Sequence, residues 1–294
     1  MAMNLRTALQ LGRVSNLPTV WTNTLAGVVL SGAGGAAFGV GFAVMLLAFS
    51  LFYVGGMFLN DAFDAKFDAT TRPERPIPSG VVSASQVFRW GFGMMAGAIV
   101  LLGWVGFGFA PRVGAAPAIA GLLLAATITL YDWNHKKNLF SPVVMGLCRV
   151  LVLVGAGLCV APTPSTALLV AAALMLCYLI GLTYVAKQEN LGRVENLWPL
   201  IFLAAPVAYG AWLMTQHASV SVFWLLFCGW MLVALWLLRR RAKGDIPRAV
   251  VSLIAGISLL DAMLIAGTGS LALASLALLG FGVTLFFQRY ISGT

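Results

Sequence analysis

Residues 60–80 of the 294-residue chain read NDAFDAKFDATTRPERPIPSG. This stretch contains four of the nine acidic residues of the protein, namely Asp61, Asp64, Asp68 and Glu74, and it lies between two long apolar segments. The whole chain is 61% hydrophobic and only 9% charged, whereas about 25% of the residues of a soluble protein are charged. The composition therefore predicts a membrane protein in which this short stretch concentrates the acidic charge.

Apolar segments long enough to cross a hydrocarbon core of about 30 Å recur along the sequence. Ten are found, at 16–33, 38–60, 86–109, 114–131, 141–161, 165–186, 196–215, 220–239, 247–267 and 270–288. Each is expected to be a helix, because lipid offers no partner to open backbone groups and the alternating pattern of a membrane β-barrel is lacking. We expect an all-α, polytopic membrane helix bundle with nine to ten transmembrane helices.

The loops between these segments suggest an internal repeat within a single domain that covers residues 1–294. A polar loop after the second segment corresponds to one after the sixth, and a basic loop after the fourth corresponds to one after the eighth. This pattern predicts two pseudo-repeated four-helix halves, at about 1–140 and 141–245, followed by C-terminal helices in 246–294.

Lysine and arginine are distributed unevenly between the two sides of the predicted bundle. They occur at both termini and in the even-numbered loops, and among the odd-numbered loops only Arg112 is found. Positively charged loops stay in the cytoplasm, so both termini and the loop at 60–80 are predicted to be cytoplasmic, in a cell or inner membrane. The same asymmetry explains the net charge of +9 without nucleic acid as a partner; membrane lipids are the expected surroundings.

The first acidic motif has the form N-D-x-x-D-x-x-x-D. If the second apolar segment continues as a helix, the offsets of 3, 4 and 7 place Asp61, Asp64 and Asp68 on one face. Three like charges on one face repel each other, and a bound cation would offset that cost. Carboxylates together with the amide oxygen of Asn60 are the ligands that suit Mg²⁺.

Two arginines follow this motif in a proline-rich segment. Arg72 and Arg75 have planar guanidinium groups that can bind two phosphate oxygens at once. Three aspartates and two arginines together predict a Mg²⁺–diphosphate site at the cytoplasmic mouth of the bundle. The alternative is a charged loop that only fixes the topology.

The chain resembles the UbiA superfamily of intramembrane prenyltransferases over most of its length. The resemblance is carried by NDxxDxxxD at 60–68, by RPxRPxPSG at 72–80, and by LGRVSNLPTVWTNTLAG at 11–27, which contains Arg13 and Asn16. It implies a bundle of about nine helices around a lipid-accessible cavity. It also implies Mg²⁺ as cofactor, an isoprenyl diphosphate donor, a lipophilic acceptor and release of diphosphate, with Arg13 and Asn16 as substrate-binding residues.

The loop after the fourth segment, YDWNHKKNLFSP at 131–142, resembles the Tyr-and-Lys loop of that family. The resemblance makes Tyr131, Asp132, Lys136 and Lys137 candidates for binding diphosphate. The alternative is a basic loop that only anchors the topology, since positive charge in a cytoplasmic loop is expected in any case.

Two charged residues lie within predicted membrane spans, where an unpaired charge is costly. Arg149 is therefore predicted to point into the site, with the diphosphate or an acidic residue as its counter-ion. Asp261 is predicted to be a protonated or hydrogen-bonded carboxyl that packs against a neighbouring helix. An acceptor-binding role for Asp261 is the weaker alternative.

Members of the family usually carry a second acidic motif, DxxxD, after the sixth helix. Here that position reads TYVAKQENLGRVENLWP and contains no DxxxD. Tyr184, Lys187, Glu189 and Asn190 are the substrate-binding candidates there, and the Lys187 ammonium would supply part of the charge of a second metal. This hypothesis predicts a weaker metal requirement or a requirement for a single metal ion. The alternative is that this half of the protein no longer binds metal.

The YVAK sequence at 184–187 resembles the EboC-like branch of the superfamily. The leading interpretation is thus a prenyltransferase that moves an isoprenyl group to an aromatic or other lipophilic acceptor. The alternative is a non-catalytic isoprenoid or lipid carrier that kept the fold and lost the second motif. A CDP-alcohol phosphotransferase is disfavoured because its DGxxAR signature is absent, and a secondary transporter because no comparable polar set lies on the outer side.

Overall fold

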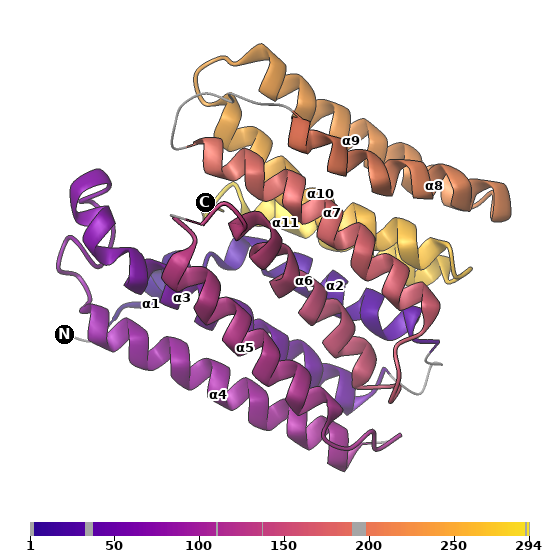
Figure 1. The fold of residues 1–294 in the computed structure, drawn as a ribbon, viewed down its shortest axis with the longest axis horizontal. Helices are drawn as coiled ribbons and strands as arrows, with labels where there is room; N and C mark the ends of the chain where they lie inside the picture. The colour runs from indigo at the N-terminus through magenta and orange to yellow at the C-terminus, as the bar shows by residue number, and fades with distance from the viewer. Residues whose placement is uncertain are drawn as a thin grey trace.

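The computed structural model of the chain describes residues 3–32, 38–109, 111–136, 138–189, 198–291 and 293. These residues form an all-helical bundle (Figure 1). The α-helices are α1 Leu5–Leu11, α2 Leu17–Leu30, α3 Val40–Thr71, α4 Ala84–Gly108, α5 Ala116–Asn134, α6 Ser141–Leu158, α7 Thr166–Glu189, α8 Ala204–Gln216, α9 Val220–Arg240, α10 Asp245–Ala266 and α11 Leu271–Phe287. Short 3-10 helices at Val14–Asn16 and Trp198–Leu203 precede α2 and α8.

All ten predicted segments form helices, which confirms the expected fold class. Eight helices in the described part of the chain are long and apolar enough to cross a membrane, counting Trp198–Gln216 as one. The other two predicted segments are shorter helices, with 14 residues in α2 and 17 in α11. The short helix α1 was not predicted. The division into two pseudo-repeated halves stays a prediction.

Helix α3 is the element that carries the acidic motif. It has 32 residues and is therefore about 48 Å long, whereas about 20 residues suffice to cross the hydrocarbon core. The last turns of α3 consequently extend beyond the length that a membrane requires. The motif at 60–68 lies in these turns, in one continuous helix, as its spacing predicted.

Helices α2 and α10 form the centre of the bundle (Figure 1). Twelve of the 14 residues of α2 and 17 of the 22 residues of α10 are buried. Helix α2 packs against α3, α6, α10 and α11. Because these neighbours surround it, α2 contacts protein along most of its length. Helices farther from α2 present large apolar side chains outward, among them Trp104 of α4, Leu122 of α5 and Leu232 of α9.

Candidate active site

A cavity of about 490 Å³ lies between α2, α3, α5, α6, α7 and α10. Its two ends differ in chemistry. The polar end, called the mouth below, is lined by residues that include Arg13, Asp64, Asp68, Arg75, Lys136 and Lys187. The opposite end is lined by apolar side chains that include Phe52, Leu124, Ile128, Val152, Leu179 and Ile254. The cavity therefore suits a molecule with an anionic head and a hydrocarbon tail.

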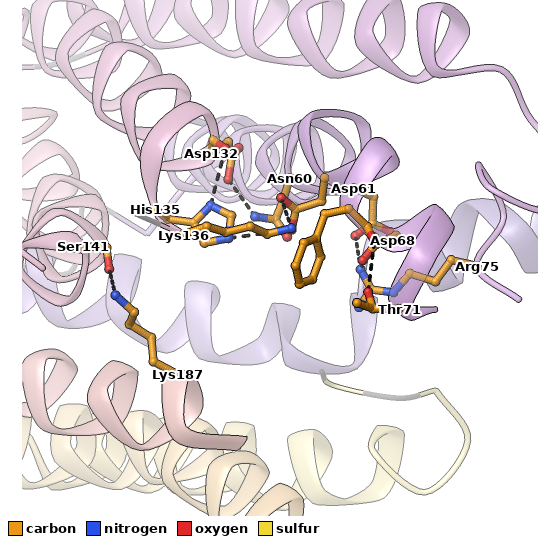
Figure 2. Close-up of polar contacts among 12 residues, drawn as sticks. Asn60, Asp61, Asp68, Thr71, Arg75, Asp132, His135, Lys136, Ser141 and Lys187 are labelled. Carbon is orange, nitrogen blue, oxygen red and sulfur yellow. Dashed lines mark hydrogen bonds and ion pairs between the residues drawn. The ribbon is translucent and has the colours of Figure 1, made fainter. Parts of the chain in front are cut away.

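Arginines form ion pairs with two of the three motif aspartates. Figure 2 shows the pair between Arg75 and Asp68. Arg13 Nη2 lies 3.1 Å from Asp61 Oδ1, and Arg75 Nη1 lies 3.3 Å from the same oxygen. Arg75 Nη1 also donates to Asp68 Oδ2 at 2.8 Å. Asp64 and Asp68 line the cavity, whereas Asp61 lies beside it, turned toward the two arginines.

The third motif aspartate, Asp64, contacts the segment that follows α5. Lys136 Nζ lies 2.8 Å from Asp64 Oδ1 and 3.5 Å from the centre of the Phe67 ring. His135 Nε2 lies 3.6 Å from Asp64 Oδ2. Burial lowers the pKa of the His135 imidazole below its ordinary value, and the Asp64 carboxylate opposes this shift. Burial thus favours the neutral ring, and the Lys136 ammonium is the closer cation to Asp64.

Asp132 joins the same cluster from α5. Its Oδ1 accepts a hydrogen bond from Asn60 Nδ2 at 3.0 Å, and its Oδ2 is buried without a partner (Figure 2). The sequence interpretation placed Asp132 in a loop after a helix that ended at residue 131. Helix α5 in fact continues to Asn134, which places Asp132 beside α3. The sequence could have indicated this position, because His135 and Lys136 follow Asp132 at offsets of 3 and 4 and so lie on the same helix face as Asp132.

Asp61, Asp64 and Asp68 are therefore paired with basic side chains, whereas Asp132 is not. No group of three or more His, Cys, Asp or Glu side chains in the described part of the chain is arranged to hold a metal ion as it stands. The oxygen donors themselves are of the kind that Mg²⁺ prefers. Asp64 and Asp68 face the cavity, and the Asp132 oxygen that lacks a partner lies in the same cluster. The residues thus fit Mg²⁺, provided that the basic side chains exchange partners when it binds.

The remaining candidates of the first half divide into two groups. Tyr131 and Arg72 line the cavity, and the Tyr131 ring stacks on His135 with 4.9 Å between the ring centres. Asn16 also lines it, but its side chain holds the C-terminal segment: Nδ2 donates to Gly293 O at 2.8 Å, and Oδ1 accepts from Gln288 Nε2 at 3.0 Å.

The candidates after the sixth predicted segment are only partly described. Lys187 lines the cavity, and its Nζ donates to Asn138 O at 3.0 Å and to Ser141 Oγ at 2.9 Å (Figure 2). Tyr184 packs against the hydrophobic core and is not among the cavity-lining residues. Lys137, Asn190 and the side chain of Glu189 lie outside the described part of the chain.

Arg149 lies in α6 and lines the cavity, as predicted. Its Nη2 donates to Thr19 Oγ1 at 2.8 Å, and its Nη1 is buried without a hydrogen-bond partner. Its Cζ lies 5.7 Å from the centre of the Tyr53 ring. Arg149 thus borders the cavity from α6, whereas the carboxylates of the mouth belong to α3 and α5.

Asp261 is a fully buried hydrogen-bond acceptor between α10 and α2. Its Oδ2 accepts from Thr22 Oγ1 at 2.8 Å, and its Oδ1 accepts from Asn23 Nδ2 at 3.1 Å. It is not among the cavity-lining residues. This arrangement confirms a hydrogen-bonded carboxyl that packs against a neighbouring helix.

Replacing Asp261 by Ala is expected to destabilise the protein by about 3 kcal/mol, because two buried donors on α2 lose their acceptor. The variant molecules that do fold should bind a diphosphate ligand with nearly the wild-type affinity, because Asp261 lies outside the cavity. Thermal unfolding in detergent measures the first effect and ligand titration the second. Loss of ligand binding with unchanged unfolding would instead place Asp261 in the site.

Together, the apolar helix bundle and its internal cavity with a charged mouth define an integral membrane protein. Residues 20–252 match the UbiA prenyltransferase family. The chain belongs to this family, and it is a membrane prenyltransferase. The resemblance that the motifs indicated is thereby confirmed.

Three relatives that share one enzyme name match different fractions of the chain. It is 28% identical to digeranylgeranylglyceryl phosphate synthase of Methanopyrus kandleri over 221 residues, which is 74% of either chain. It is 32% identical to the enzyme of that name from Sulfolobus acidocaldarius over 111 residues, 37% of this chain and 40% of that one. The Ignicoccus hospitalis enzyme is 33% identical over 41% of this chain and 37% of its own.

A solved structure from work on digeranylgeranylglyceryl phosphate synthase in membranes has the same fold. It superposes with a TM-score of 0.62 over 90% of this chain and 98% of that one. The sequence identity is 16%, so this likeness supports the fold alone.

Proposed function

We propose that the protein transfers an isoprenyl group from an isoprenyl diphosphate to a lipophilic acceptor in a Mg²⁺-dependent reaction that releases diphosphate. The observation that carries this proposal is the cavity, with acids and bases gathered at its mouth and apolar side chains at its other end. A diphosphate with a hydrocarbon tail matches both ends at once. The relatives named as digeranylgeranylglyceryl phosphate synthases make a product that contains two such tails.

The mouth would bind the diphosphate by an exchange of ion pairs. Asp64, Asp68 and the amide oxygen of Asn60 would hold Mg²⁺, with Asp61 beside them. Arg75 and Lys136, released from these carboxylates, would then contact phosphate oxygens, which guanidinium and ammonium groups bind well. Mg²⁺ held by these residues would supply positive charge next to the leaving diphosphate. The resting ion pairs hold the basic groups within a few ångströms of where they would be needed.

The apolar end would hold the isoprenyl tail and protect the reacting carbon. Phe52, Leu124 and Val152 line this end and would keep water away from the allylic cation that forms as the carbon–oxygen bond breaks. The Tyr53 ring also lines the cavity and could stabilise positive charge through its face. The acceptor then forms a bond to the allylic carbon and loses a proton.

We also propose that the mouth and both termini are cytoplasmic, on the distribution of lysine and arginine. An isoprenyl diphosphate supplied from the cytoplasm would then reach the mouth directly. Labelling of single cysteines introduced at Glu74 and at Arg112 in sealed vesicles tests this, because the two positions should react from opposite sides.

The function is tested with purified protein in detergent, isoprenyl diphosphates of several lengths and geranylgeranylglyceryl phosphate as one acceptor. Mg²⁺-dependent binding, followed by release of diphosphate and formation of a prenylated product, is the expected result. If the protein bound a diphosphate but formed no product with any acceptor in an extract of membrane lipids, the isoprenoid carrier would be favoured. Failure of every diphosphate to bind in the presence of Mg²⁺ would contradict the proposal.

Lys187 is expected to make a second metal ion unnecessary, since its ammonium already lies at the mouth with two acceptors. Activity of the wild type should therefore depend on the first power of the free Mg²⁺ concentration. Lys187→Met should weaken diphosphate binding, while Lys243→Met, which removes the same charge from an exposed loop, should not. A second-order dependence on Mg²⁺ in the wild type would contradict this prediction.

A further inference from the structure

Arg149 is a charged side chain deep in the bundle. It is the ninth residue of α6, which begins at Ser141, so its Cα lies about 12 Å along the helix from that end. It borders the cavity, and its Nη1 is buried without a hydrogen-bond partner. A guanidinium group keeps its positive charge in every protein environment, and an unpaired charge at this depth is costly. Arg149 therefore needs an anionic or strongly accepting partner.

No carboxylate of the described residues forms a hydrogen bond or ion pair with Arg149. Asp61, Asp64 and Asp68 are paired with Arg13, Arg75 and Lys136, and Asp132 accepts a hydrogen bond from Asn60. Asp261 attracts Arg149 electrostatically, but its two oxygens accept hydrogen bonds from Thr22 and Asn23. No ion pair joins Arg149 to any carboxylate in the described part of the chain.

The guanidinium is nevertheless held in a fixed position. Thr19 Oγ1 donates to Asn16 O at 2.7 Å, so its lone pairs are free to accept from Arg149 Nη2 at 2.8 Å. Tyr53 lies against the guanidinium and donates its hydroxyl proton to Arg13 O at 3.3 Å. A cation that is oriented by its neighbours, forms no ion pair and keeps one buried donor without an acceptor is arranged for a ligand.

The chemistry of the reaction narrows the choice of ligand, an argument that rests on the proposed function. An allylic cation formed in this cavity is repelled by a free guanidinium. An anion on Arg149 removes that repulsion. The donor's diphosphate already has Arg13, Arg75, Lys136 and Lys187 at the mouth, whereas Arg149 contacts none of the carboxylates there.

We propose that Arg149 binds an acidic group of the acceptor, a carboxylate or a phosphate, and thereby selects acidic acceptors over neutral ones of the same shape. Binding of such an acceptor would also neutralise the interior cation before the donor ionises. Thr19 is then a positioning residue, which acts on the acceptor through Arg149.

Two matched pairs of probes test this proposal. The first pair compares geranylgeranylglyceryl phosphate with neutral geranylgeranylglycerol. The second compares 4-hydroxybenzoate with neutral 4-hydroxybenzyl alcohol, so that a phosphate and a carboxylate are tested separately. Equilibrium binding is measured in detergent with and without Mg²⁺ and a donor analogue that cannot ionise. The variants are Arg149→Gln, Arg149→Lys and Thr19→Val. Arg89→Gln, which removes the same charge from an exposed position of α4, is the matched control.

The wild type and Arg89→Gln should bind at least one acid about 30-fold more tightly than its neutral partner. Arg149→Gln should abolish this preference, while Arg149→Lys and Thr19→Val should retain part of it. The affinity for the donor analogue should stay unchanged in all four variants, which also reports that they are folded.

Three results would overturn the proposal. They are a wild type that prefers neither acid, an acid preference that survives in Arg149→Gln, and a loss of donor-analogue binding in Arg149→Gln as large as in Asp64→Asn. The last would assign Arg149 to the diphosphate. If the wild type itself failed to bind the donor analogue, the proposed function would fail, and the acid preference measured without donor would still decide the role of Arg149.

Discussion

Replacing Asp64 by Asn is expected to lower kcat/KM by about 1000-fold or more, because under the proposed function the substitution removes a charged ligand of the Mg²⁺ that would stabilise the leaving diphosphate. Asp64 lines the mouth and is balanced by Lys136 at 2.8 Å. Asparagine keeps the shape of the side chain but supplies neither the charge nor the second anionic oxygen. Lys136 would also lose the group that positions it.

The measurement is prenyl transfer at saturating Mg²⁺, together with binding of a donor analogue. Glu74→Gln is the matched control, since Glu74 lies in the same acidic stretch, is exposed and loses the same charge. The control should keep nearly full activity. If Asp64→Asn transferred prenyl groups as fast as Glu74→Gln, the acidic motif would not be the catalytic centre.

Replacing Gly27 by Val is expected to destabilise the bundle by about 3 kcal/mol or more, since the added atoms meet backbone that cannot move away. A Cβ at Gly27 would run into the carbonyl oxygen of Leu153 and lie 2.9 Å from Ala156 Cβ. Helices α2 and α6 pack closely at this point, and small residues at such crossings let membrane helices approach.

The yield of monodisperse protein after extraction and the midpoint of thermal unfolding measure this effect. Gly229→Val is the matched control, because Gly229 is exposed in the middle of α9 and a Cβ there has nothing within 4 Å. The control should unfold near the wild-type temperature. Equal unfolding temperatures for the two variants would mean that α2 and α6 do not pack as described.

Much of the fold was predictable because its causes are local. Membrane helices must satisfy their own backbone groups, so apolar length alone located all ten segments. The one-sided spacing of Asp61, Asp64 and Asp68 likewise depends only on helical geometry. The 14-residue length of α2 and its nearly complete burial were not predictable from apolar length alone.

The site could be predicted less completely, because its contacts join distant parts of the chain. Asp132 pairs with Asn60 across 72 positions, and Asn16 holds Gly293 across 277. No spacing rule links such residues, and only their packing reveals them. The charge of Arg149, by contrast, was sufficient to predict that it borders the cavity. The likeness of residues 184–187 to the EboC-like branch stays a prediction.

The pairing of acids with bases at the mouth bears on how the protein is assembled. Asp61, Asp64 and Asp68 each have a basic partner within the same chain, so the charges of these three carboxylates are balanced by the protein itself. The polypeptide can therefore be inserted and folded before any divalent ion arrives. Chelator treatment should then silence the purified protein without unfolding it, and adding the ion back should restore it at once.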